Sequence, residues 1–473
     1  MKNLPDDFVS YTRKVMGEER FSRFLLSMDE LPPVSLRVNR MKNSVSVPCA
    51  DIVSGADDKP NVNAEVVPWC PDGYYLSERP SFTFDPLLHA GHYYVQEASS
   101  MFLAEVLRQH VDGKVAMLDL CAAPGGKSTL ALQTLAEGSL LVSNEPVKTR
   151  ANVLAENLSK WGNPNVIVTN AYPSDIARTG ALFDVVLCDV PCSGEGMFRK
   201  DEGAIGEWSV QTVDRLWRLQ REIVAEAWKT LRPGGLFVYS TCTFNLRENE
   251  ENVRWIAEEY DADILPVKIS QQWNITASLL EGFDSPVYRF IPGITRGEGL
   301  FMAVLRKPDC ASLSSGERRR RKGGKETKAS DKIDLPWKGW KGLGDGFQYV
   351  QVGEKVLALP CSLTPYYNIL REGRVRMLKA GVALGTVKGR DLVPDIELAL
   401  YDNLDTSLFP VFEADHATAL AYLRRDAIEL PVEMPKGYVL IAHEGHALGF
   451  VKNIGNRSNN LYPLEWRIKS SKI

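Results

Sequence analysis

Two cysteines and an aspartate follow the ends of two apolar runs in this sequence, where their side chains could take part in a reaction. One apolar run is followed by Asp189, then Val-Pro and Cys192, and a second run, which starts at Leu236, ends in Cys242. Both runs are typical of buried parallel strands. In open α/β sheets ligands bind outside the carboxyl ends of the strands, so we expect both thiols and the carboxylate in one crevice.

Two neighbouring cysteines could form a metal centre, a redox pair, part of a packed core or a nucleophilic site. A metal centre is disfavoured because no Cys-x-x-Cys spacing occurs and the histidines cluster elsewhere: His89, His92, His110, His416, His443 and His446. The segment from His443 to His446 lacks the H-E-x-x-H spacing and predicts a turn. A nucleophilic cysteine near a carboxylic acid and a lysine remains, whereas Cys188, inside its strand, is predicted to be an inert buried thiol.

A glycine-rich turn forms a candidate cofactor site. An apolar strand runs into Cys121-Ala-Ala-Pro-Gly-Gly-Lys127 and then into a helical pattern. Glycines let a ligand approach the backbone, and the helix start has unpaired N–H groups. The dinucleotide pattern G-x-G-x-x-G is absent. Glu145 ends the next strand, where a carboxylate can accept both hydroxyls of an adenosine ribose, with a solvated strand-end acid as the alternative.

These residues need a scaffold, and the pattern between about Gly91 and Lys307 predicts a doubly wound α/β sheet. The predicted strands are Val115–Leu120, Leu140–Asn144, Val166–Thr169, Val185–Cys188, Leu236–Ser240 and Leu300–Leu305. The predicted helices are Ser128–Ala136, Thr149–Lys160, Thr212–Leu231 and Glu248–Glu259, the last beginning after Asn245 as a candidate N-cap.

The flanking segments have other patterns. A helical segment, Asp7–Met28, and an alternating strand, Ser35–Arg40, predict an N-terminal domain over residues 1–90, before an α/β domain over 91–309. Ten basic and three acidic residues between Arg318 and Lys341 predict a flexible linker at 310–335. Short apolar segments separated by turn residues predict a β-rich region over 336–473: Tyr349–Val352, Lys355–Leu359, Val382–Val387, Tyr438–Ala442 and Ala447–Val451.

Length and composition agree with this division. The 473 residues suggest roughly three domains, and 44% hydrophobic with 25% charged residues is typical of a globular chain rather than a disordered or fibrous one. The net charge of −4 alone argues against nucleic-acid binding. However, the basic run carries 10 − 3 = +7, so the remainder carries −4 − 7 = −11.

Nothing in the sequence predicts secretion or a membrane partner. Residues Met1–Arg20 lack the apolar core of a signal peptide, and no apolar stretch approaches the roughly 18 residues of a membrane span. The eight cysteines are spread thinly, which is typical of reduced thiols. We expect a cytoplasmic protein, and a monomer.

Three motifs, in order and well spaced, resemble one known family. They are Cys121-Ala-Ala-Pro-Gly-Gly-Lys127, Asp189-Val-Pro-Cys-Ser-Gly-Glu-Gly196, and Ser240-Thr-Cys-Thr-Phe244 followed by Arg247-Glu-Asn-Glu-Glu-Asn252. They closely resemble the S-adenosylmethionine-dependent RNA cytosine-5 methyltransferases of the Nop/Sun family. Gly194–Lys200 and the tail ending Asn460-Leu-Tyr-Pro463 look like the bacterial RsmF/YebU branch, which methylates 16S ribosomal RNA.

The resemblance implies a fold and a reaction. The fold is α/β: a Rossmann-like class I S-adenosylmethionine-dependent methyltransferase core, an N-terminal α+β RNA-binding domain and a C-terminal β-rich PUA-like region. Cytosine C5 is a poor nucleophile, so a thiolate must first add to C6. The family pattern makes Cys242 the nucleophile and implicates Cys192 in breaking the covalent adduct. Asp189 would contact N3 of the base, and Lys127 would point towards the same site.

The resemblance also implies the residues that bind S-adenosylmethionine. Glu145 would contact the ribose, and Asn170 stands where many relatives carry an aspartate that accepts from the adenine amino group. The implied set is Cys121, Ala122, Ala123, Pro124, Gly125, Gly126, Lys127, Glu145, Arg150, Asn170 and Asp189.

RNA is the expected partner, because a base must be turned out of the RNA to reach such a crevice while other groups hold the phosphates. The candidate contacts are Arg37, Arg40, Lys42, the Arg318–Lys341 run with Trp337 and Trp340, Arg457, Lys469 and Lys472. The leading substrate is 16S rRNA in or near an assembling small subunit. A tRNA methyltransferase and a non-catalytic RNA-binding assembly factor are the alternatives, and the intact Cys242, Cys192, Asp189 and Lys127 argue against the second.

Overall fold

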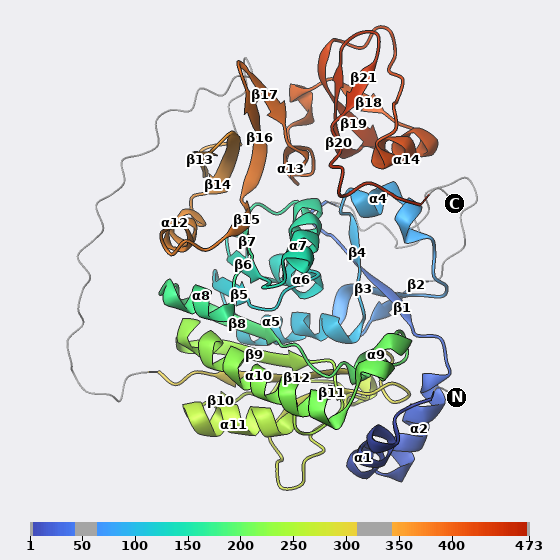
Figure 1. Cartoon of the computed structure of the whole chain (residues 1–473), viewed down its shortest axis with the longest axis vertical. Coiled ribbons are helices and arrows are strands. Elements are labelled where there is room, and N and C mark those ends of the chain that lie inside the picture. The colour runs from blue at the N-terminus through green and yellow to red at the C-terminus, as the bar shows by residue number, and fades with distance from the viewer. Residues whose placement is uncertain (1–2, 43–63, 310–342, 471–473) are drawn as a thin grey trace, which may run out of the picture.

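The computed structural model of the chain describes residues 3–42, 64–309 and 343–470 (Figure 1). The predicted linker, the basic run with its two tryptophans, and Lys472 lie outside the described residues.

A nine-stranded sheet occupies the middle of the molecule. Its order is β10-β12-β9-β8-β5-β6-β7-β15, with β11 paired to β12. The strands are β5 (Ala116–Asp119), β6 (Leu140–Asn144), β7 (Val166–Thr169), β8 (Phe183–Asp189), β9 (Leu231–Thr241), β10 (Asp263–Ile264), β11 (Val287–Phe290), β12 (Leu300–Arg306) and β15 (Met377–Ala380). Strands β5 to β9 run parallel, and β10, β11, β12 and β15 pair antiparallel. The predicted doubly wound sheet is confirmed, because the six predicted strands correspond to β5–β9 and β12.

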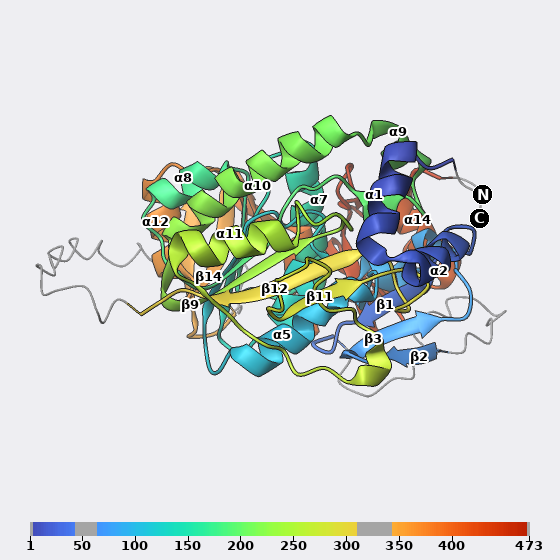
Figure 2. The same cartoon turned by 90° about the horizontal axis from the view of Figure 1, so that it is seen from below.

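Helices cover both faces of this sheet. They are α5 (Leu103–His110), α6 (Gly126–Thr134), α7 (Lys148–Trp161), α8 (Pro173–Arg178), α9 (Glu202–Glu207), α10 (Val210–Thr230) and α11 (Glu250–Tyr260). Figure 2 shows α8, α10 and α11 on one side and α5 on the other. Leu118 and Val142 pack in the core under α8, α10 and α11, whereas Met117 and Leu141 pack under α5, α6 and α7. Because both faces are buried, these strands read as continuous apolar runs.

The N-terminal part holds a four-stranded sheet with order β2-β3-β1-β4. Its elements are α1 (Asp6–Met16), α2 (Glu18–Met28), β1 (Val34–Val38), β2 (Ala64–Val67), β3 (Cys70–Leu76), α4 (Pro86–His89) and β4 (Tyr93–Val95). The predicted helix Asp7–Met28 is two helices, because Gly17 adopts φ 73° between them. Phe8 and Phe24 anchor the pair against Phe198 and Phe244, with ring centroids 5.0 and 5.1 Å apart.

The C-terminal part contains two four-stranded sheets, β13-β14-β16-β17 and β18-β19-β20-β21, together with helices. Its elements are β13 (Phe347–Val352), β14 (Lys355–Pro360), α12 (Thr364–Glu372), β16 (Val382–Lys388), β17 (Asp391–Pro394), α13 (Ile396–Ala399), β18 (Val411–Glu413), α14 (His416–Arg424), β19 (Gly437–His443), β20 (His446–Asn453) and β21 (Ser458–Asn460). Strand β15 was not predicted. Although it belongs to the C-terminal part of the sequence, it pairs with β7 at the edge of the central sheet, where Met377 is opposite Thr169.

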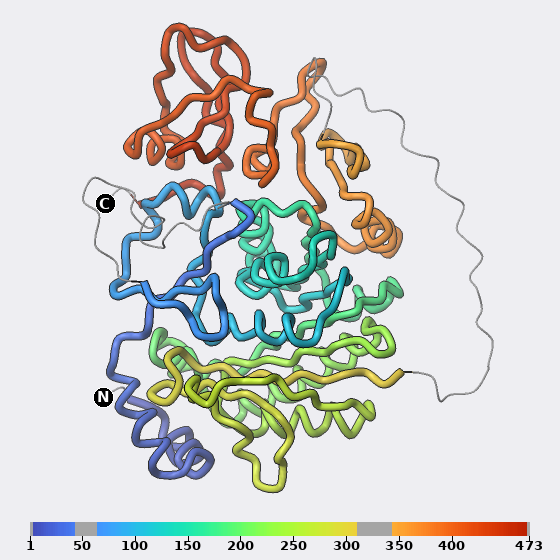
Figure 3. The backbone as a smooth tube through the Cα atoms, turned by 180° about the vertical axis from the view of Figure 1, so that it is seen from behind, coloured from blue at the N-terminus to red at the C-terminus, as the bar shows by residue number. Residues whose placement is uncertain are grey.

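The last sheet lies beside the N-terminal part, as the tube seen from behind shows (Figure 3). Ala90 packs in one core cluster with Leu400, Tyr422 and other C-terminal residues. The rings of His92 and His446 have centroids 3.8 Å apart. Ends of the chain that are far apart in sequence are therefore packed against each other.

Two local predictions have different outcomes. The segment from His443 to His446 is the turn between β19 and β20, as predicted. The predicted helix start after Asn245 is wrong, because α11 begins at Glu250 with Asn249 before it. Asn245 is instead buried in a polar network described below.

Among the described helices, none combines the length and apolar composition that crossing a membrane requires.

Candidate active site

A cavity of about 930 Å³ opens at the carboxyl ends of the central strands. Its size is that of a pocket for a small organic ligand. The glycine-rich turn, Asp189 and Cys242 line it, as expected for the edge of the sheet where parallel strands end. The N-terminal part supplies another wall that sequence reasoning did not identify: Leu31, Pro32, Pro33, Val34, Ser35, Leu76, Ser77, Glu78 and Arg79.

The two predicted thiols are in contact. Cys192 Sγ lies 3.1 Å from Cys242 Sγ, and the Cys242 backbone N–H donates to Cys192 Sγ at 3.2 Å. The hydrogen bond with Cys242, burial, and the nearby charges of Cys242 and Glu248 raise the pKa of Cys192 well above its ordinary value. Cys192 is therefore held as a thiol, and either sulfur can be the donor in its contact with Cys242.

Cys188 behaves as predicted for an inert thiol. Its side chain is fully buried, and burial raises its pKa well above the ordinary value.

Asp189 and Lys127 form an ion pair beside the thiols. Lys127 Nζ donates to Asp189 Oδ2 at 2.7 Å, and Ser240 Oγ donates to Asp189 Oδ1 at 2.6 Å. Burial lowers the pKa of Lys127, but the charge of Asp189 and its hydrogen bond outweigh this, so the pKa is raised. Lys127 is thus a cation within the cavity, and Asp189 is held as its carboxylate acceptor.

Gly196 lets two loops meet at the cavity wall. Its N–H donates to Cys242 O at 2.8 Å. A Cβ atom at this position would lie 2.8 Å from Gly299 O and 2.9 Å from Cys242 O. Only glycine allows the loop after Cys192 to approach the loop that carries Cys242 this closely.

The glycine-rich turn has the features of a cofactor cradle. Asp119, the last residue of β5, accepts from Ser128 Oγ through Oδ2 at 2.6 Å, while its buried Oδ1 has no hydrogen-bond partner among the described residues. Burial raises the pKa of Asp119 to about 7. A Cβ atom on Gly126 would touch Tyr94 and Gln96 at 3.4 and 3.5 Å. An unpaired acceptor lining a cavity at such a turn fits a ligand with N–H or O–H donors.

Asp119 was missed by the sequence reasoning. Its signal was available, because it is an acid at the end of a predicted strand immediately before the glycine-rich turn.

Three predicted cofactor contacts lie beside the turn rather than in the cavity. Glu145 is 1% exposed and accepts from the Val147 N–H at 2.9 Å, and Arg150 lies 3.5 Å from its carboxylate. Asn170 Nδ2 donates to Glu145 O and Pro146 O, both at 2.9 Å. Of these three side chains none belongs to the described lining of the cavity.

The structure corrects one predicted RNA contact and places the others that belong to the described residues. Arg37 is 1% exposed, donates to Gln96, Gln133 and Thr129, and lies over Trp161, so the prediction that it contacts RNA is wrong.

The Lys42 side chain also makes hydrogen bonds within the protein: its Nζ donates to Ala90 O at 2.5 Å and to Lys160 O at 2.8 Å. Arg40 pairs with Asp72 but keeps 61% of its side chain exposed, and Arg457 and Lys469 are exposed. Within the described ranges, no group of three or more His, Cys, Asp and Glu side chains could hold a metal ion.

Comparison with known proteins agrees with this geometry. Residues 105–306 match the model of the 16S rRNA methyltransferase RsmB/F, 4–98 the N-terminal domain of 16S rRNA methyltransferase RsmF, and 409–468 the RsmF PUA domain. Ribosomal RNA small subunit methyltransferase F from Cronobacter sakazakii is 30% identical over 98% of this chain and 96% of its own. The chain belongs to the RsmF family.

The RsmF relative from Enterobacter sp. strain 638 is 29% identical over 98% of this chain and 95% of its own. Among solved structures, a methyltransferase homologue from Pyrococcus horikoshii superposes with TM-score 0.54 at 26% identity, covering 64% of this chain and 96% of its own. NSun6 from the same organism superposes with TM-score 0.53 at 21% identity, covering 64% and 98%.

Membership in the RsmF family makes the protein a methyltransferase that depends on S-adenosylmethionine. The predicted fold class is confirmed, with a Rossmann-like core, an N-terminal domain and a PUA domain. The boundaries predicted at residues 90, 309 and 335 stay predictions.

Proposed function

We propose that this protein transfers a methyl group from S-adenosylmethionine to C5 of a cytosine in 16S rRNA, and that it works as a cytoplasmic monomer. The curated relatives that match nearly the whole chain are small-subunit rRNA methyltransferases by name. The observation that carries the proposal is the contact of Cys192 with Cys242, which lines the cavity together with the Asp189–Lys127 ion pair.

Cys242 is the proposed nucleophile. Its thiolate adds to C6 of the cytosine, which leaves electron density at C5 for attack on a methyl group. The neighbouring Cys192 thiol donates towards Cys242 and stabilises a negative charge on its sulfur.

Asp189 and Lys127 are proposed to act on the N3 edge of the base. Addition of the thiolate to C6 moves negative charge towards N3, and a proton or donor there stabilises it. Lys127 Nζ donates to Asp189 Oδ2 at 2.7 Å, so the proton for N3 can pass from the Lys127 ammonium through Asp189. Ser240 fixes the second carboxylate oxygen and so orients the pair.

Cys192 is proposed to resolve the adduct. Once Cys242 has become a thioether, it no longer accepts a hydrogen bond from Cys192 and no longer raises the pKa of Cys192. Cys192 can then lose its own proton to solvent, and the resulting thiolate takes the C5 proton. The C5–H electron pair restores the C5–C6 double bond, the C6–S bond breaks, and its electrons return to Cys242.

The glycine-rich turn from Cys121 to Lys127 is proposed to hold S-adenosylmethionine, with Glu145, Arg150, Asn170 and Asp189 as further contacts. The bound cofactor supplies a methyl group on a sulfonium. The unpaired Asp119 Oδ1 is an additional acceptor for the donor groups of this ligand.

Bisulfite sequencing tests the reaction and its substrate. We expect one or more 5-methylcytosines in 16S rRNA to disappear from a strain lacking the protein. They should return with the wild-type chain but not with Cys242→Ala. Loss at a tRNA position instead would favour the tRNA alternative, and no loss in either RNA would reject the enzyme.

A trapping experiment tests the two cysteine roles. Cys192→Ala should accumulate a covalent protein–RNA adduct, visible as a shifted band under denaturing conditions, because the elimination step lacks its base. Cys192→Ala/Cys242→Ala should show none. An adduct that persists in the double variant would mean that Cys242 is not the nucleophile.

A further inference from the structure

Two buried glutamates join the loops that carry the two cysteines. Glu195, on the loop after Cys192, reaches the other loop, where its Oε2 accepts from the N–H groups of Phe244 at 2.7 Å and Asn245 at 3.0 Å. Its Oε1 accepts from Trp208 Nε1 at 3.0 Å. The first loop is thus tied to the backbone just after Cys242.

Glu248 makes the reciprocal connection. Starting on the loop of Cys242, its Oε2 accepts from the Ser193 N–H, next to Cys192, at 3.0 Å, and from Gln220 Nε2 at 2.6 Å. Gln220 Nε2 also donates to Pro191 O at 3.0 Å. The backbone on both sides of Cys192 is therefore held through Glu248 and Gln220. We call the Glu195 and Glu248 carboxylates together the glutamate clasp.

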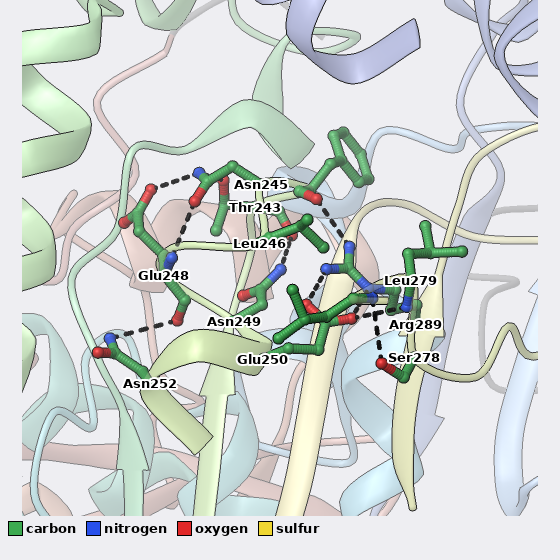
Figure 4. Close-up of polar contacts among 12 residues, drawn as sticks. Thr243, Asn245, Leu246, Glu248, Asn249, Glu250, Asn252, Ser278, Leu279 and Arg289 are labelled. Atoms are coloured by element: carbon green, nitrogen blue, oxygen red, sulfur yellow. Dashed lines mark hydrogen bonds and ion pairs between the residues drawn. The ribbon is translucent and has the colours of Figure 1, made fainter. Parts of the chain in front are cut away.

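Asn245 links the two halves of the clasp. Its Nδ2 donates to Glu195 Oε1 at 3.0 Å and to Glu248 Oε1 at 2.7 Å, and its Oδ1 accepts from the Glu248 N–H at 2.9 Å. Figure 4 shows the contacts of Asn245 with Glu248. The asparagine that the sequence suggested as a helix cap accepts from the N–H three residues further on, as a cap would, and it also bridges the two carboxylates.

A buried ion pair anchors the second loop. Arg289 Nη1 donates to Phe244 O at 2.7 Å, and Arg289 Nε donates to Glu250 Oε1 at 2.6 Å. The side chains of Arg289 and Glu250 are at most 1% exposed. Figure 4 shows the two side chains facing each other. The loop of Cys242 is therefore a fixed base on which Glu248 can hold Cys192.

Burying the two carboxylates of the glutamate clasp lowers the stability of the fold, so we expect a functional role that explains them. Glu195 and Glu248 are 1% and 0% exposed, and in the described part of the chain no Lys or Arg nitrogen lies within 4.0 Å of either carboxylate. Buried carboxylates without a cation cost several kcal/mol unless neutral donors compensate. Their donors come mostly from the two cysteine-bearing loops, so the compensation depends on keeping those loops together.

We propose that Glu195 and Glu248 are positioning residues that hold Cys192 against Cys242 and so set the rate at which the covalent RNA adduct is resolved. This inference rests on the proposed cytosine methylation. Elimination requires a base at C5 while Cys242 is still bonded to C6, so the separation of the two sulfur atoms decides whether Cys192 can reach the proton. The 3.1 Å contact is the distance that the clasp maintains.

Glu248→Gln is the informative variant. A glutamine places an NH₂ group where the carboxylate accepts from either Ser193 N–H or Asn245 Nδ2, so at least one contact becomes donor against donor. Glu251→Gln is the matched control, because it removes the same charge three residues further along the chain at a partly exposed residue. Gln220→Met is a second variant: it keeps the carboxylate and removes the Nε2 donor, and it also removes the Oε1 acceptor of Tyr239 and Asn252.

The first measurement needs no RNA. In the full-length protein, the pH dependence of iodoacetamide alkylation is followed for each cysteine by mass spectrometry. Because the charge of Glu248 contributes to the raised pKa of Cys192, the midpoint for Cys192 should be lower in Glu248→Gln than in the wild type. The midpoint should be unchanged in Glu251→Gln.

Alkylation of the buried Cys188 in the same experiment reports unfolding. If Glu248→Gln exposes Cys188 and is therefore unfolded, the test is made with Gln220→Met. Gln220→Met should then make Cys192 react faster while Cys188 stays protected. An unchanged Cys192 profile in a folded Glu248→Gln or Gln220→Met protein overturns the proposal.

The second measurement follows the adduct by rapid quench. Glu248→Gln should slow adduct resolution about tenfold, with a much smaller effect on adduct formation. In the Cys192→Ala background, Glu248→Gln should cause no further slowing, because the residue acts through Cys192. If Cys192→Ala/Glu248→Gln resolves the adduct much more slowly than Cys192→Ala alone, Glu248 does not act through Cys192 and the positioning role is rejected. If no variant ever forms an adduct, cytosine methylation fails, and the alkylation profiles still decide whether the clasp positions Cys192.

Discussion

Three cysteines at the ends of two neighbouring strands have different surroundings. Cys188 is sealed in the core, whereas Cys192 and Cys242 touch each other and Cys242 lines the cavity. Sequence spacing predicted this difference, because residues after a strand end are exposed to a crevice. It did not predict Glu195 and Glu248, since an acid in a loop is ordinarily solvated and only the folded chain shows that both are buried.

Arg37 was predicted to contact RNA, but its side chain is buried in the protein. It lies on an alternating strand, and its charge suggested RNA binding, yet its guanidinium donates to Gln133 at 2.9 Å and Thr129 at 2.6 Å. Arg37→Met should therefore lower the free energy of unfolding by about 2–4 kcal/mol, because buried acceptors lose their donor. Urea unfolding at fixed pH measures this decrease.

Arg40→Met is the control for that experiment. Its side chain is 61% exposed, and an exposed ion pair with Asp72 contributes only about 0–1 kcal/mol. We expect little change in stability and weaker RNA binding. If Arg37→Met were as stable as the wild type but bound RNA poorly, Arg37 would be an RNA contact after all.

At the scale of elements, hydrophobic periodicity was sufficient for the central sheet. Strands β6 and β7 have the bounds that the sequence predicted, because runs buried on both faces end sharply at turn residues. Strand β15 was missed since its pairing with β7 joins Met377 to Thr169, and no local pattern reveals a partner about 200 residues away. The glycine that divides α1 from α2 was likewise overlooked inside a continuous helical pattern.

The packing of the last sheet on the N-terminal part predicts a pH effect. His92 is 3% exposed, and burial, with His446 and Lys42 nearby, lowers its pKa to about 2. The unfolded chain binds a proton below about pH 6.5 that the folded chain does not. This histidine should therefore cost up to about 1.4 kcal/mol of stability per pH unit as the pH falls below 6.5.

Urea unfolding between pH 7.5 and 5 tests this effect. His92→Gln carries no titrating group, so its stability should depend less on pH than that of the wild type. His110→Gln, at a more exposed position, should keep most of the wild-type dependence. Parallel pH profiles for the wild type and His92→Gln would contradict the argument.

For the whole molecule, net charge is a poor guide to its partner. The total of −4 combines a basic run of +7 with a remainder of −11, so the positive charge is concentrated in one segment of a chain that is otherwise net negative. The candidate active-site cavity is lined by charges of both signs: Glu78, Glu97, Asp119, Asp189 and Glu298 beside Arg79, Lys127, Lys200 and Arg296. These charges nearly cancel, so we expect most of the attraction for the RNA backbone to come from the basic run.

The salt dependence of RNA binding tests whether the basic run, rather than the cavity, binds the RNA phosphates. Replacing the ten Lys and Arg residues of the Arg318–Lys341 run by glutamine should weaken binding and flatten the plot of log K against log salt. On single-stranded RNA the slope should decrease by about 0.7 for each phosphate that the variant no longer neutralises.

Lys229→Gln, at an exposed position on α10, should leave the slope unchanged. At saturating RNA and low salt, the variant without the basic run should still methylate within about twofold of the wild-type rate, because its cavity is intact. If neutralising the run leaves the slope unchanged, the phosphate contacts belong to exposed residues such as Arg40, Arg457 and Lys469, and the basic run has no part in holding the RNA.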